Sequence, residues 1–558
     1  MGETQFDVAI IGSGIGGSTL GAILARHGVR TVIFEAKSHP RFAIGESMIL
    51  ETSETMRATA EIFDVPELAY FSSEHYFARI GTSHGVKRHF SYLHHTPGQP
   101  QDITRSLQAV IPRQPHGHEL HIFRQDSDAL LTTVAIAYGA TVLQETPVRA
   151  IDIGADGVTI TTARDATFTA KYVVDAGGYK SLLAEKFGLR DHDLLTHSRA
   201  LFTHMVGVPD FHDVGAGRKA YGLPYSVAEG TLHHIFPGGW LWVIPFNNHD
   251  KATNPLCSVG LLLDPRLHPV RNDLTPEEEF RAFIAQYPAI AAQLWHARPV
   301  RPWTRTGRIQ YSSTQVVGDR WALLGHAAGF IDPLFSKGLY VTSMTVARLA
   351  NLLLDAQSTG DYSAAAFQPL EEMTLNYIRA NDRLIASAYK SFRNYPLWSA
   401  YSVLWLLGAY TELVKLSSVR VLATDRHDYA RRAQCLKLVG GGFPEFDRVA
   451  ARIDAIMDAV DPDDDADVAH ATAAMRAILL DVEWLPPPFA DVLHGKNHLP
   501  VNKLRPGLLK PDDGFMGHGD YRAHFFDNRS TFELLRKFVA DKVRYSTYRV
   551  THQHVLVE

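Results

Sequence analysis

Cysteine is almost missing from this chain, which has only two among its 558 residues. Cys257 and Cys435 lie far apart in the sequence, which is typical of reduced thiols and not of a disulfide framework. A targeting signal is also missing, because the first expected strand begins near Phe6 and leaves no room for a signal peptide. These absences predict a cytoplasmic protein.

Long apolar runs, basic charge and metal-binding patterns are lacking too. The longest uncharged stretch, Pro396–Thr411, is shorter than a membrane span and contains Ser, Tyr and Thr. We interpret it as a buried helix, with contact to a membrane surface as the alternative. The formal charge of −5 gives no basic footprint for nucleic acid. No metal site is predicted, because the clustered histidines lack cysteine or carboxylate partners at ligand spacing: His116, His118, His121, His233 and His234.

The first forty residues carry the strongest pattern in the chain. An apolar strand, Phe6–Ile11, ends at a G-x-G-x-x-G run, Gly12–Gly17, and a helical stretch follows. A second strand, Arg30–Phe34, then ends at Glu35. Glycine turns alone are common, but the order strand, glycine turn, helix, strand and acid is typical of a dinucleotide-binding unit.

Each residue of this pattern has a physical role. Gly12 permits the tight turn, Gly14 lets the backbone approach a pyrophosphate, and Gly17 lets the helix pack closely on the strand. The start of the helix presents free N–H groups and a positive dipole to the phosphates. Glu35 can accept hydrogen bonds from a ribose. The sequence therefore predicts dinucleotide binding.

The remaining segments predict an α/β protein of two or three domains. Residues 1–355 are expected to form the nucleotide-binding module, with an inserted β-rich substrate region at about residues 195–315. Residues 356–558 are expected to be mostly helical and to cover the substrate side. Lys37 and Arg41 belong either to a solvated loop or to the cofactor site. Lys87, between a glycine turn and an alternating strand pattern, reads in isolation as an exposed lysine.

Further motifs resemble one family of flavoproteins. Asp175-Ala176-Gly177-Gly178 and the Gly325–Gly329 turn are similar to those of aromatic hydroxylases, geranylgeranyl reductases and flavin-dependent halogenases. Trp240–Pro245 matches the W-x-W-x-I-P signature of the halogenases, and Lys87 stands where that family carries its essential lysine. The residues around Lys87 and the run Asp332–Ser336 resemble the subgroup that acts on phenolic rings. The resemblance covers about residues 1–400.

The resemblance implies a Rossmann-type FAD-binding domain of the aromatic-hydroxylase class and a set of site residues. Lys87 would be catalytic, Ser336, Lys337 and Gly338 would bind halide, and Trp240, Trp242, Ile244 and Pro245 would shield the flavin. The two tryptophans also fit a buried aromatic strand, and Lys337 either aids anion binding or points outward. The residues expected to bind FAD are Gly12, Gly14, Gly17, Glu35, Lys37, Arg41, Ile44, Glu46, Ser47, Arg124, Val148, Asp332 and Leu339.

The implied chemistry needs reduced FAD, O2 and chloride or bromide. Reduced FAD forms a C4a-hydroperoxide, halide attacks its distal oxygen, and the resulting hypohalous acid reaches the ring through Lys87. Halide must lose water in a site that compensates its charge. The reduced FAD would come from a separate flavin reductase, because the sequence shows no second nucleotide motif for NAD(P)H.

Two positions depart from the family pattern. His326 stands where related flavoproteins usually carry an aspartate beside the ribityl chain, so that contact is in doubt. Phe335 replaces the glutamate of tryptophan-type halogenases, which favours a ring activated by its own oxygen, with a general base that the sequence does not identify.

The resulting prediction is a halogenase of a phenolic ring, with a tyrosyl or carrier-bound natural-product precursor as one option. The alternatives are an FAD-dependent aromatic monooxygenase and a flavin-binding assembly partner without turnover.

Overall fold

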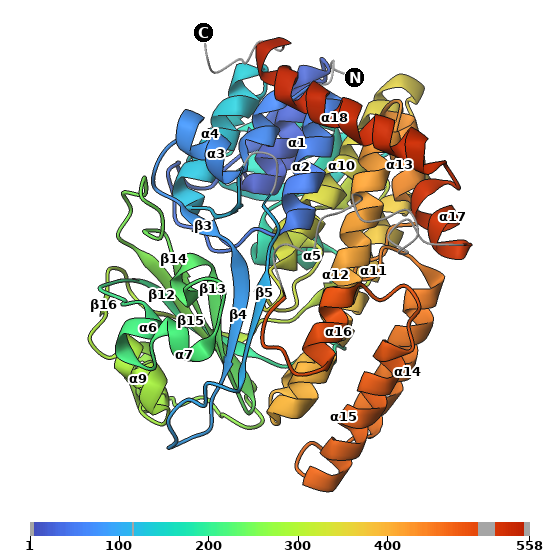
Figure 1. The fold of residues 1–558 in the computed structure, drawn as a ribbon. Coiled ribbons are helices and arrows are strands. Elements are labelled where there is room, and N and C mark those ends of the chain that lie inside the picture. Colours follow the sequence, from blue (N-terminus) through green and yellow to red (C-terminus); the bar gives the residue numbers. More distant parts are fainter. Residues whose placement is uncertain (1–4, 114–116, 500–518, 552–558) are drawn as a thin grey trace.

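The computed structural model describes residues 5–113, 117–499 and 519–551, with side chains described as far as residue 543. Two eight-stranded sheets and a group of long helices make up the fold (Figure 1). The first sheet has the order β19-β20-β10-β1-β2-β7, with β8 and β9 attached to β10, and β1 pairs in parallel with both β2 and β10. Its strands are β1 (Phe6–Ile11), β2 (Thr31–Phe34), β7 (Thr141–Leu143), β8 (Val148–Ile153), β9 (Val158–Thr162), β10 (Thr167–Asp175), β19 (Val317–Gly318) and β20 (Trp321–Leu323).

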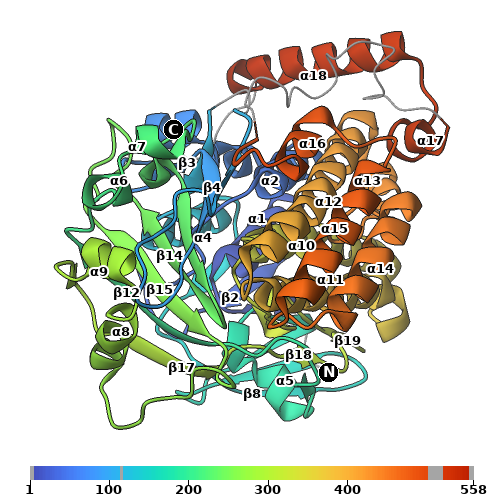
Figure 2. The same ribbon diagram turned by 60° about the horizontal axis from the view of Figure 1, so that its bottom comes forward.

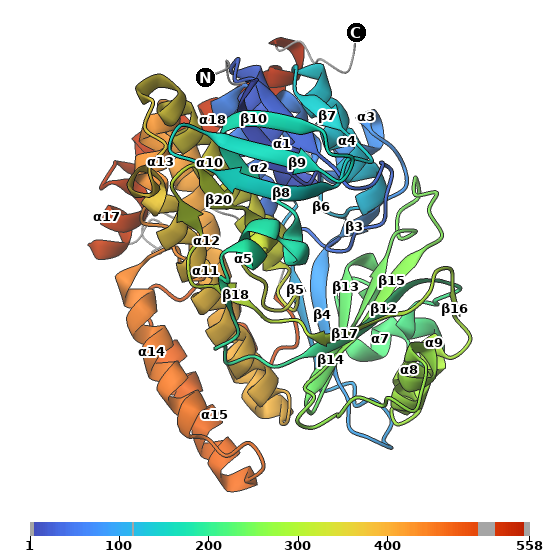
Figure 3. The same ribbon diagram turned by 180° about the vertical axis from the view of Figure 1, so that it is seen from behind.

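The parallel strands of the first sheet read as nearly continuous apolar runs because helices cover them. Helix α1 (Ile15–Arg26) crosses from β1 to β2 and is buried along most of its length. Figure 3 shows β8, β9 and β10 side by side at the back of this domain. The predicted hairpin, Val148–Ile153 and Val158–Thr162, is confirmed as β8 and β9.

The second sheet has the order β16-β12-β15-β14-β13-β4-β5, with β17 paired to β12. It contains the predicted β-rich stretch, but it also takes β4 and β5 from outside residues 195–315. Strand β4 pairs in parallel with β13, so a segment that precedes the insertion by more than a hundred positions completes the sheet. Its strands are β4 (His89–His94), β5 (Ser106–Val110), β12 (Arg199–Val206), β13 (Thr231–Phe236), β14 (Gly239–Pro245), β15 (Cys257–Leu263), β16 (Arg298–Pro299) and β17 (Thr304–Arg308).

Strands β3 (Gly85–Lys87) and β6 (Glu119–His121) pair as a short antiparallel ribbon. This ribbon belongs to neither of the two large sheets. Helices α2 (Leu50–Phe63) and α4 (Arg124–Ala137) belong to the nucleotide-binding side. The ribbon brings Lys87 and Glu119 opposite each other, and their side chains therefore project to the same face.

The C-terminal helices pack beside both sheets (Figure 2). The predicted domain boundary at residue 355 falls inside α10, and the division into domains stays a prediction. Helix α12 contains the apolar run Pro396–Thr411 and is largely buried, and among the described residues no helix is long and apolar enough to cross a membrane. The helices are α10 (Lys337–Thr359), α11 (Ala364–Ser391), α12 (Tyr395–Leu422), α13 (Arg426–Ala433), α14 (Pro444–Ala459), α15 (Asp465–Leu480), α16 (Pro487–Leu493), α17 (Asp520–Phe526) and α18 (Thr531–Thr551).

Candidate active site

A cavity of about 1060 Å³ lies at the ends of β1, β2 and β10 and extends to the second sheet. Ligands of open α/β sheets bind at this edge, beyond the carboxyl ends of the strands. All the residues predicted to bind FAD line the cavity except Gly17. The cavity is therefore large enough for a dinucleotide and is walled by the predicted residues.

The glycine loop has the geometry that the sequence predicts. Gly12 has φ +98°, and a Cβ atom there would lie 2.8 Å from the carbonyl oxygen of Ala176. A Cβ atom on Gly17 would lie 2.0 Å from the carbonyl oxygen of Gly12, so Gly17 serves helix–strand packing behind the cavity wall. Around Gly14 the nearest atom would be Arg41 Nη2, at 3.8 Å, which leaves its cavity face open. The loop leaves a flat backbone surface for a pyrophosphate.

Glu35 is buried at the end of β2 and accepts hydrogen bonds from the backbone N–H of Ser13 at 3.1 Å and of Lys37 at 3.0 Å. Arg41 Nη2 lies 3.0 Å from Glu35 Oε2. Burial raises the pKa of Glu35, but the Arg41 charge and these hydrogen bonds outweigh it, so the pKa is lowered overall. Glu35 is thus an ionised acceptor, and the loop with Lys37 and Arg41 lines the cavity.

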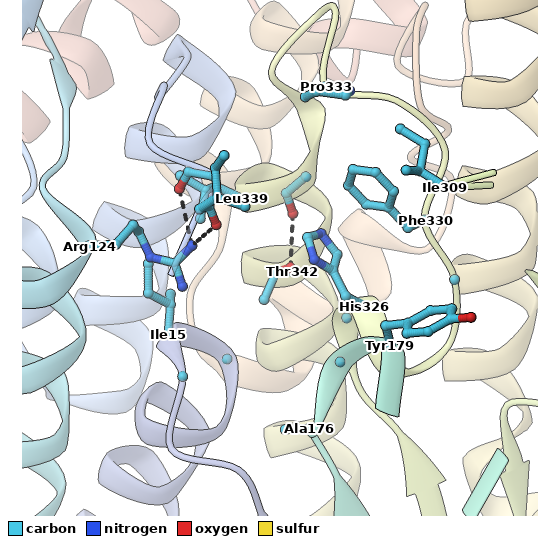
Figure 4. Close-up of a pocket in the computed structure, with 18 of the residues that line it drawn as sticks. Ile15, Arg124, Ala176, Tyr179, Ile309, His326, Phe330, Pro333, Leu339 and Thr342 are labelled. Atoms are coloured by element: carbon cyan, nitrogen blue, oxygen red, sulfur yellow. Dashed lines mark hydrogen bonds between the residues drawn. The ribbon is translucent and has the colours of Figure 1, made fainter. Parts of the chain in front are cut away.

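Arg124 organises the opposite wall. Its guanidinium donates to the Asp128 carboxylate and to the backbone carbonyls of Ile44 and Gly45. Figure 4 shows Arg124 at the cavity, with hydrogen bonds drawn from its guanidinium. These bonds fix the loop that carries Ile44, Glu46 and Ser47 into the cavity wall. Arg124 therefore acts on the cofactor site by holding this loop as well as by its charge.

At the far end of the cavity, His326 faces the beginning of α10 near Leu339 and Thr342 (Figure 4). Burial, with the charge of Arg124, lowers the pKa of His326 to about 4. The imidazole is therefore neutral at pH 7 and differs in charge from the aspartate that the resemblance leads one to expect.

The predicted halide turn opens α10. Ser336 has φ +56°, in the left-handed region, and precedes the first helical residue, Lys337. The first N–H groups of a helix have no intrahelical acceptor, so the turn can bind an anion. Ser336, Lys337 and Gly338 all line the cavity.

The alternative in which Lys337 points outward is wrong, whereas its part in anion binding stays a prediction. Its Nζ lies 2.6 Å from Glu51 Oε1 and 2.8 Å from Glu412 Oε2, inside the protein. The side chain therefore does not point outward, because two buried carboxylates hold it.

Lys87 is fully buried, so its interpretation as an exposed lysine is wrong. Its Nζ donates to Ser336 Oγ at 3.3 Å and lies 3.5 Å from the centroid of the Phe90 ring. Burial lowers the pKa of Lys87 well below its ordinary value, and the charges of Glu119 and Glu51 offset this only in part. The Lys87 amine thus lies next to Ser336 of the halide turn, and Ser336 joins it to the cavity.

Aromatic side chains surround this amine. Phe335 stacks on Trp405 at 4.5 Å between ring centroids, and Trp405 meets Phe90 edge to face at 5.2 Å. Tyr92 and Trp398 pack behind them, with centroids 4.9 Å apart. This aromatic cluster, Phe90, Tyr92, Phe335, Trp398 and Trp405, joins strand β4, the segment before α10, and helix α12.

The predicted shielding residues lie on β14. Trp240, Trp242 and Ile244 line the cavity, whereas Pro245 lies outside its wall and accepts a hydrogen bond at its carbonyl from His121 Nδ1. The two indole centroids are 5.8 Å apart. The tryptophans are therefore both a packed strand and a cavity wall.

Trp240 is fixed by a buried carboxylate. Its Nε1 lies 3.2 Å from Asp332 Oδ1 and 3.1 Å from the hydroxyl of Tyr389. Tyr389 and Ser198 also donate to Asp332 Oδ2, at 2.8 and 2.9 Å. Burial raises the pKa of Asp332 to about 6, against the effect of these hydrogen bonds. The network fixes the plane of the indole.

Several functional neighbours escape sequence reasoning. Trp398 and Trp405 recur seven positions apart within the apolar run, a helical spacing that could have placed them on one face. Glu51 and Glu412 have no local signal, because they meet Lys337 only through the packing of α2 and α12 on α10. His116 lies outside the described residues, and among those described no group of three possible ligands is arranged for a metal ion.

Comparisons with known proteins agree with this geometry. A family model described as Tryptophan halogenase matches residues 73–428, and one described as an NAD(P)-binding Rossmann-like domain matches residues 10–55. Monodechloroaminopyrrolnitrin halogenase PrnC of Pseudomonas fluorescens is 45% identical over 412 residues, which are 73% of this chain and 71% of PrnC. Tetracycline 7-halogenase of Kitasatospora aureofaciens is 42% identical over 433 residues, 76% of this chain and 78% of the relative. The crystal structure of halogenase PltM with phloroglucinol and FAD has a TM-score of 0.83 at 32% identity, covering 89% of this chain and 100% of PltM.

Proposed function

The chain belongs to the tryptophan halogenase family of flavin-dependent enzymes, and from this premise we propose that it halogenates a phenolic ring through Lys87. The observation that carries the proposal is the buried Lys87 amine, 3.3 Å from Ser336 Oγ at the halide turn and packed on the ring of Phe90. An amine in this position can receive an oxidised halogen and present it to a ring.

FAD is the cofactor of this enzyme, with halide and O2 as co-substrates. The observations that support its placement are the open backbone at Gly14, the ionised Glu35 and the loop held by Arg124. When bound in reduced form, the flavin would activate O2, which supplies the oxidising equivalents that convert halide to hypohalous acid. A separate flavin reductase is proposed as the source of reduced flavin.

Ser336, Lys337 and Gly338 would hold the halide through backbone N–H groups at the start of α10. The positive end of the helix dipole supports an anion there. Lys337 contributes its backbone and not its charge, because its ammonium is occupied by Glu51 and Glu412.

Lys87 would handle the oxidised halogen in one of two forms. It holds hypohalous acid by a hydrogen bond, or its nitrogen takes the halogen while the hydroxyl leaves as water with an amine proton. In the second form the ring then takes the halogen, the ring proton is released, and the nitrogen regains a proton. Both forms keep the oxidant in place, and the indoles of Trp240 and Trp242 separate the ring from the flavin.

The proposed substrate is an electron-rich phenol. The cluster beside Lys87 is aromatic, which suits a flat ring, and Phe335 brings no carboxylate to it. PltM has been crystallised with phloroglucinol, itself a phenol. A carrier-bound precursor is a second form of the same substrate class, and one relative is described as a chlorinase of a peptidyl-carrier-protein substrate.

The experiment combines the enzyme with FAD, a flavin reductase, NADH, chloride or bromide, and a panel of free and carrier-bound phenols. A product with a halogen isotope doublet supports halogenation, whereas a product with added oxygen would indicate the monooxygenase alternative. Lys87→Met should lower the rate by roughly 100-fold or more while FAD still binds. The exposed Lys251→Met serves as the matched control and should keep full activity. Unchanged halogenation by Lys87→Met would remove Lys87 from the mechanism.

A further inference from the structure

A buried triad of charged residues lies directly behind the halide turn. Lys337 is bonded to Glu51 and Glu412, at 2.6 and 2.8 Å, and the three residues are 2%, 5% and 0% exposed. They come from three helices, α10, α2 and α12. With the lysine charged and both glutamates ionised, the triad has a net charge of −1.

Other polar groups around the triad do not cancel this charge. The Val439 N–H donates to Glu412 Oε2 at 3.2 Å. The phenols of Tyr340 on α10 and Tyr377 on α11 also face Glu412. Lys87 and Glu119 of the ribbon face Glu51 from the other side.

An ionised triad opposes the binding of an anion at the same turn. In an interior of low dielectric, negative charges repel more strongly than in water, and little water is present to screen them. A proton on one glutamate makes the triad neutral and removes this repulsion. The N–H groups and the helix dipole at Ser336–Gly338 then act on the halide unopposed.

We propose that halide enters the turn together with a proton that is taken up by Glu412. The step is balanced: one halide ion and one proton leave the solvent, the halide binds at the turn, and the Glu412 carboxylate becomes a carboxylic acid. Glu412 is the acceptor because its carboxylate is fully buried and shares the single Lys337 ammonium with Glu51. Burial also raises the pKa of Glu412, and the nearby Glu51 raises it further, although Lys337 lowers it. The inference rests on the halide site of the proposed function.

The test measures proton uptake directly on the FAD-loaded enzyme. Bromide or iodide is titrated into weakly buffered protein with a pH-indicator dye, and halide binding is followed by the flavin absorbance. Wild type should take up about one proton for each halide at a pH above the pKa of Glu412, and its halide Kd should rise by up to tenfold per pH unit there. Absence of proton uptake at every pH between 6 and 9, with halide bound, would overturn the proposal.

Variants separate the triad from other titrating groups. Glu412→Gln and Glu51→Gln each remove one negative charge, so halide binding should become independent of pH and take up no proton. The exposed Glu372→Gln is the matched control and should behave like wild type. A Glu412→Gln protein with the wild-type pH slope would contradict the assignment. If that variant does not fold, proton uptake by wild type and the slope of Glu51→Gln still decide the question.

Failure of the halide site itself has a different signature. Gly338→Ala should weaken halide binding if the turn is the site, because the added methyl group would lie 3.2 Å from His326 Nε2 in the cavity wall and displace the turn. If Gly338→Ala and Ser336→Ala leave the halide Kd unchanged, the site assignment is wrong. If they weaken binding but wild type takes up no proton, the site stands and the proton coupling is wrong.

Discussion

Lys87 and Glu119 are cross-strand partners at the end of the ribbon β3–β6, and they are 0% and 1% exposed. Burial drives both groups toward their neutral forms, the lysine by lowering its pKa and the glutamate by raising its pKa to about 7. Ser53 donates to Glu119 Oε1 at 2.6 Å, while Oε2 has no hydrogen-bond partner within the described chain. The carboxyl group beside the amine is thus poised to titrate near neutrality.

Glu119→Gln should change how stability depends on pH. Between pH 4.5 and 7 the native Glu119 keeps its proton while the unfolded chain loses it, so the native state binds more protons and the free energy of unfolding falls as pH rises. The shift corresponds to about 3 kcal/mol. The variant should therefore match wild type at pH 4 and exceed its stability by up to about 3 kcal/mol at pH 8.

Urea denaturation at both pH values measures this difference, with Glu372→Gln as the exposed control. Equal pH dependence in wild type and Glu119→Gln would show that the carboxyl group titrates normally.

Sequence reasoning works at the residue scale where a motif is local. The glycine loop and Glu35 lie within one strand–helix–strand unit, and their spacing fixes their positions in space. The partners of Lys337 were missed because Glu51 and Glu412 lie far from it in the chain. The burial of Lys87 was equally invisible, because the alternating strand pattern around it does not reveal what covers its face.

At the scale of elements, two glycines of the same loop have different roles. Gly17 allows the helix to pack on the strand, and Gly14 leaves room for the cofactor. A methyl group on Gly17 would collide with the carbonyl oxygen of Gly12, at 2.0 Å, and backbone atoms must shift to relieve it. A methyl group on Gly14 meets nothing closer than 3.8 Å, but it enters the path of a pyrophosphate.

Gly17→Ala should therefore lower the free energy of unfolding of the FAD-free protein by about 2–4 kcal/mol. Gly14→Ala should keep that stability within about 0.5 kcal/mol and weaken FAD binding by roughly tenfold or more. Urea denaturation and FAD titration give the two quantities. A Gly14→Ala protein with normal FAD affinity would mean that the pyrophosphate lies elsewhere.

The sequence predicts the helices and strands that depend on a local pattern. It does not predict which distant strands pair with one another. The hairpin of β8 and β9 follows from alternation around the Asp156-Gly157 turn, and the apolar run of α12 follows from its length and lack of charge. The pairing of β4 with β13 has no local cause, because it joins segments that are distant in sequence. The sequence therefore predicts a second sheet with fewer strands than the structure contains.

At the scale of the whole molecule, Arg420 ties the C-terminal helices to the nucleotide-binding side. From α12 it reaches Glu54 on α2 at 2.8 Å and Asp541 on α18 at 2.6 Å. Figure 1 shows α18 lying across the top of the molecule, over the helices of both parts. One guanidinium thus joins three elements that are far apart in the chain.

Arg420→Met should lower the free energy of unfolding by about 3–5 kcal/mol, because it removes the positive charge that pairs with buried carboxylates. It should also make α18 more accessible, which limited proteolysis followed by mass spectrometry detects. Arg431→Met, which removes an exposed pair with Asp428, should cost less than about 1 kcal/mol. Similar losses from both variants would mean that Arg420 does not act as the tie.

The ring that touches the Lys87 amine is the phenyl group of Phe90, and the indole of Trp405 lies one layer farther away. Benzene without an oxygen or nitrogen substituent resists electrophilic halogen, whereas indoles and phenols react readily. Under the proposed mechanism, an inert aromatic side chain thus lies next to the amine that would carry the oxidised halogen. Self-damage over many turnovers should then accumulate on Trp405 and spare its nearer neighbour, which would set the working lifetime of the catalyst.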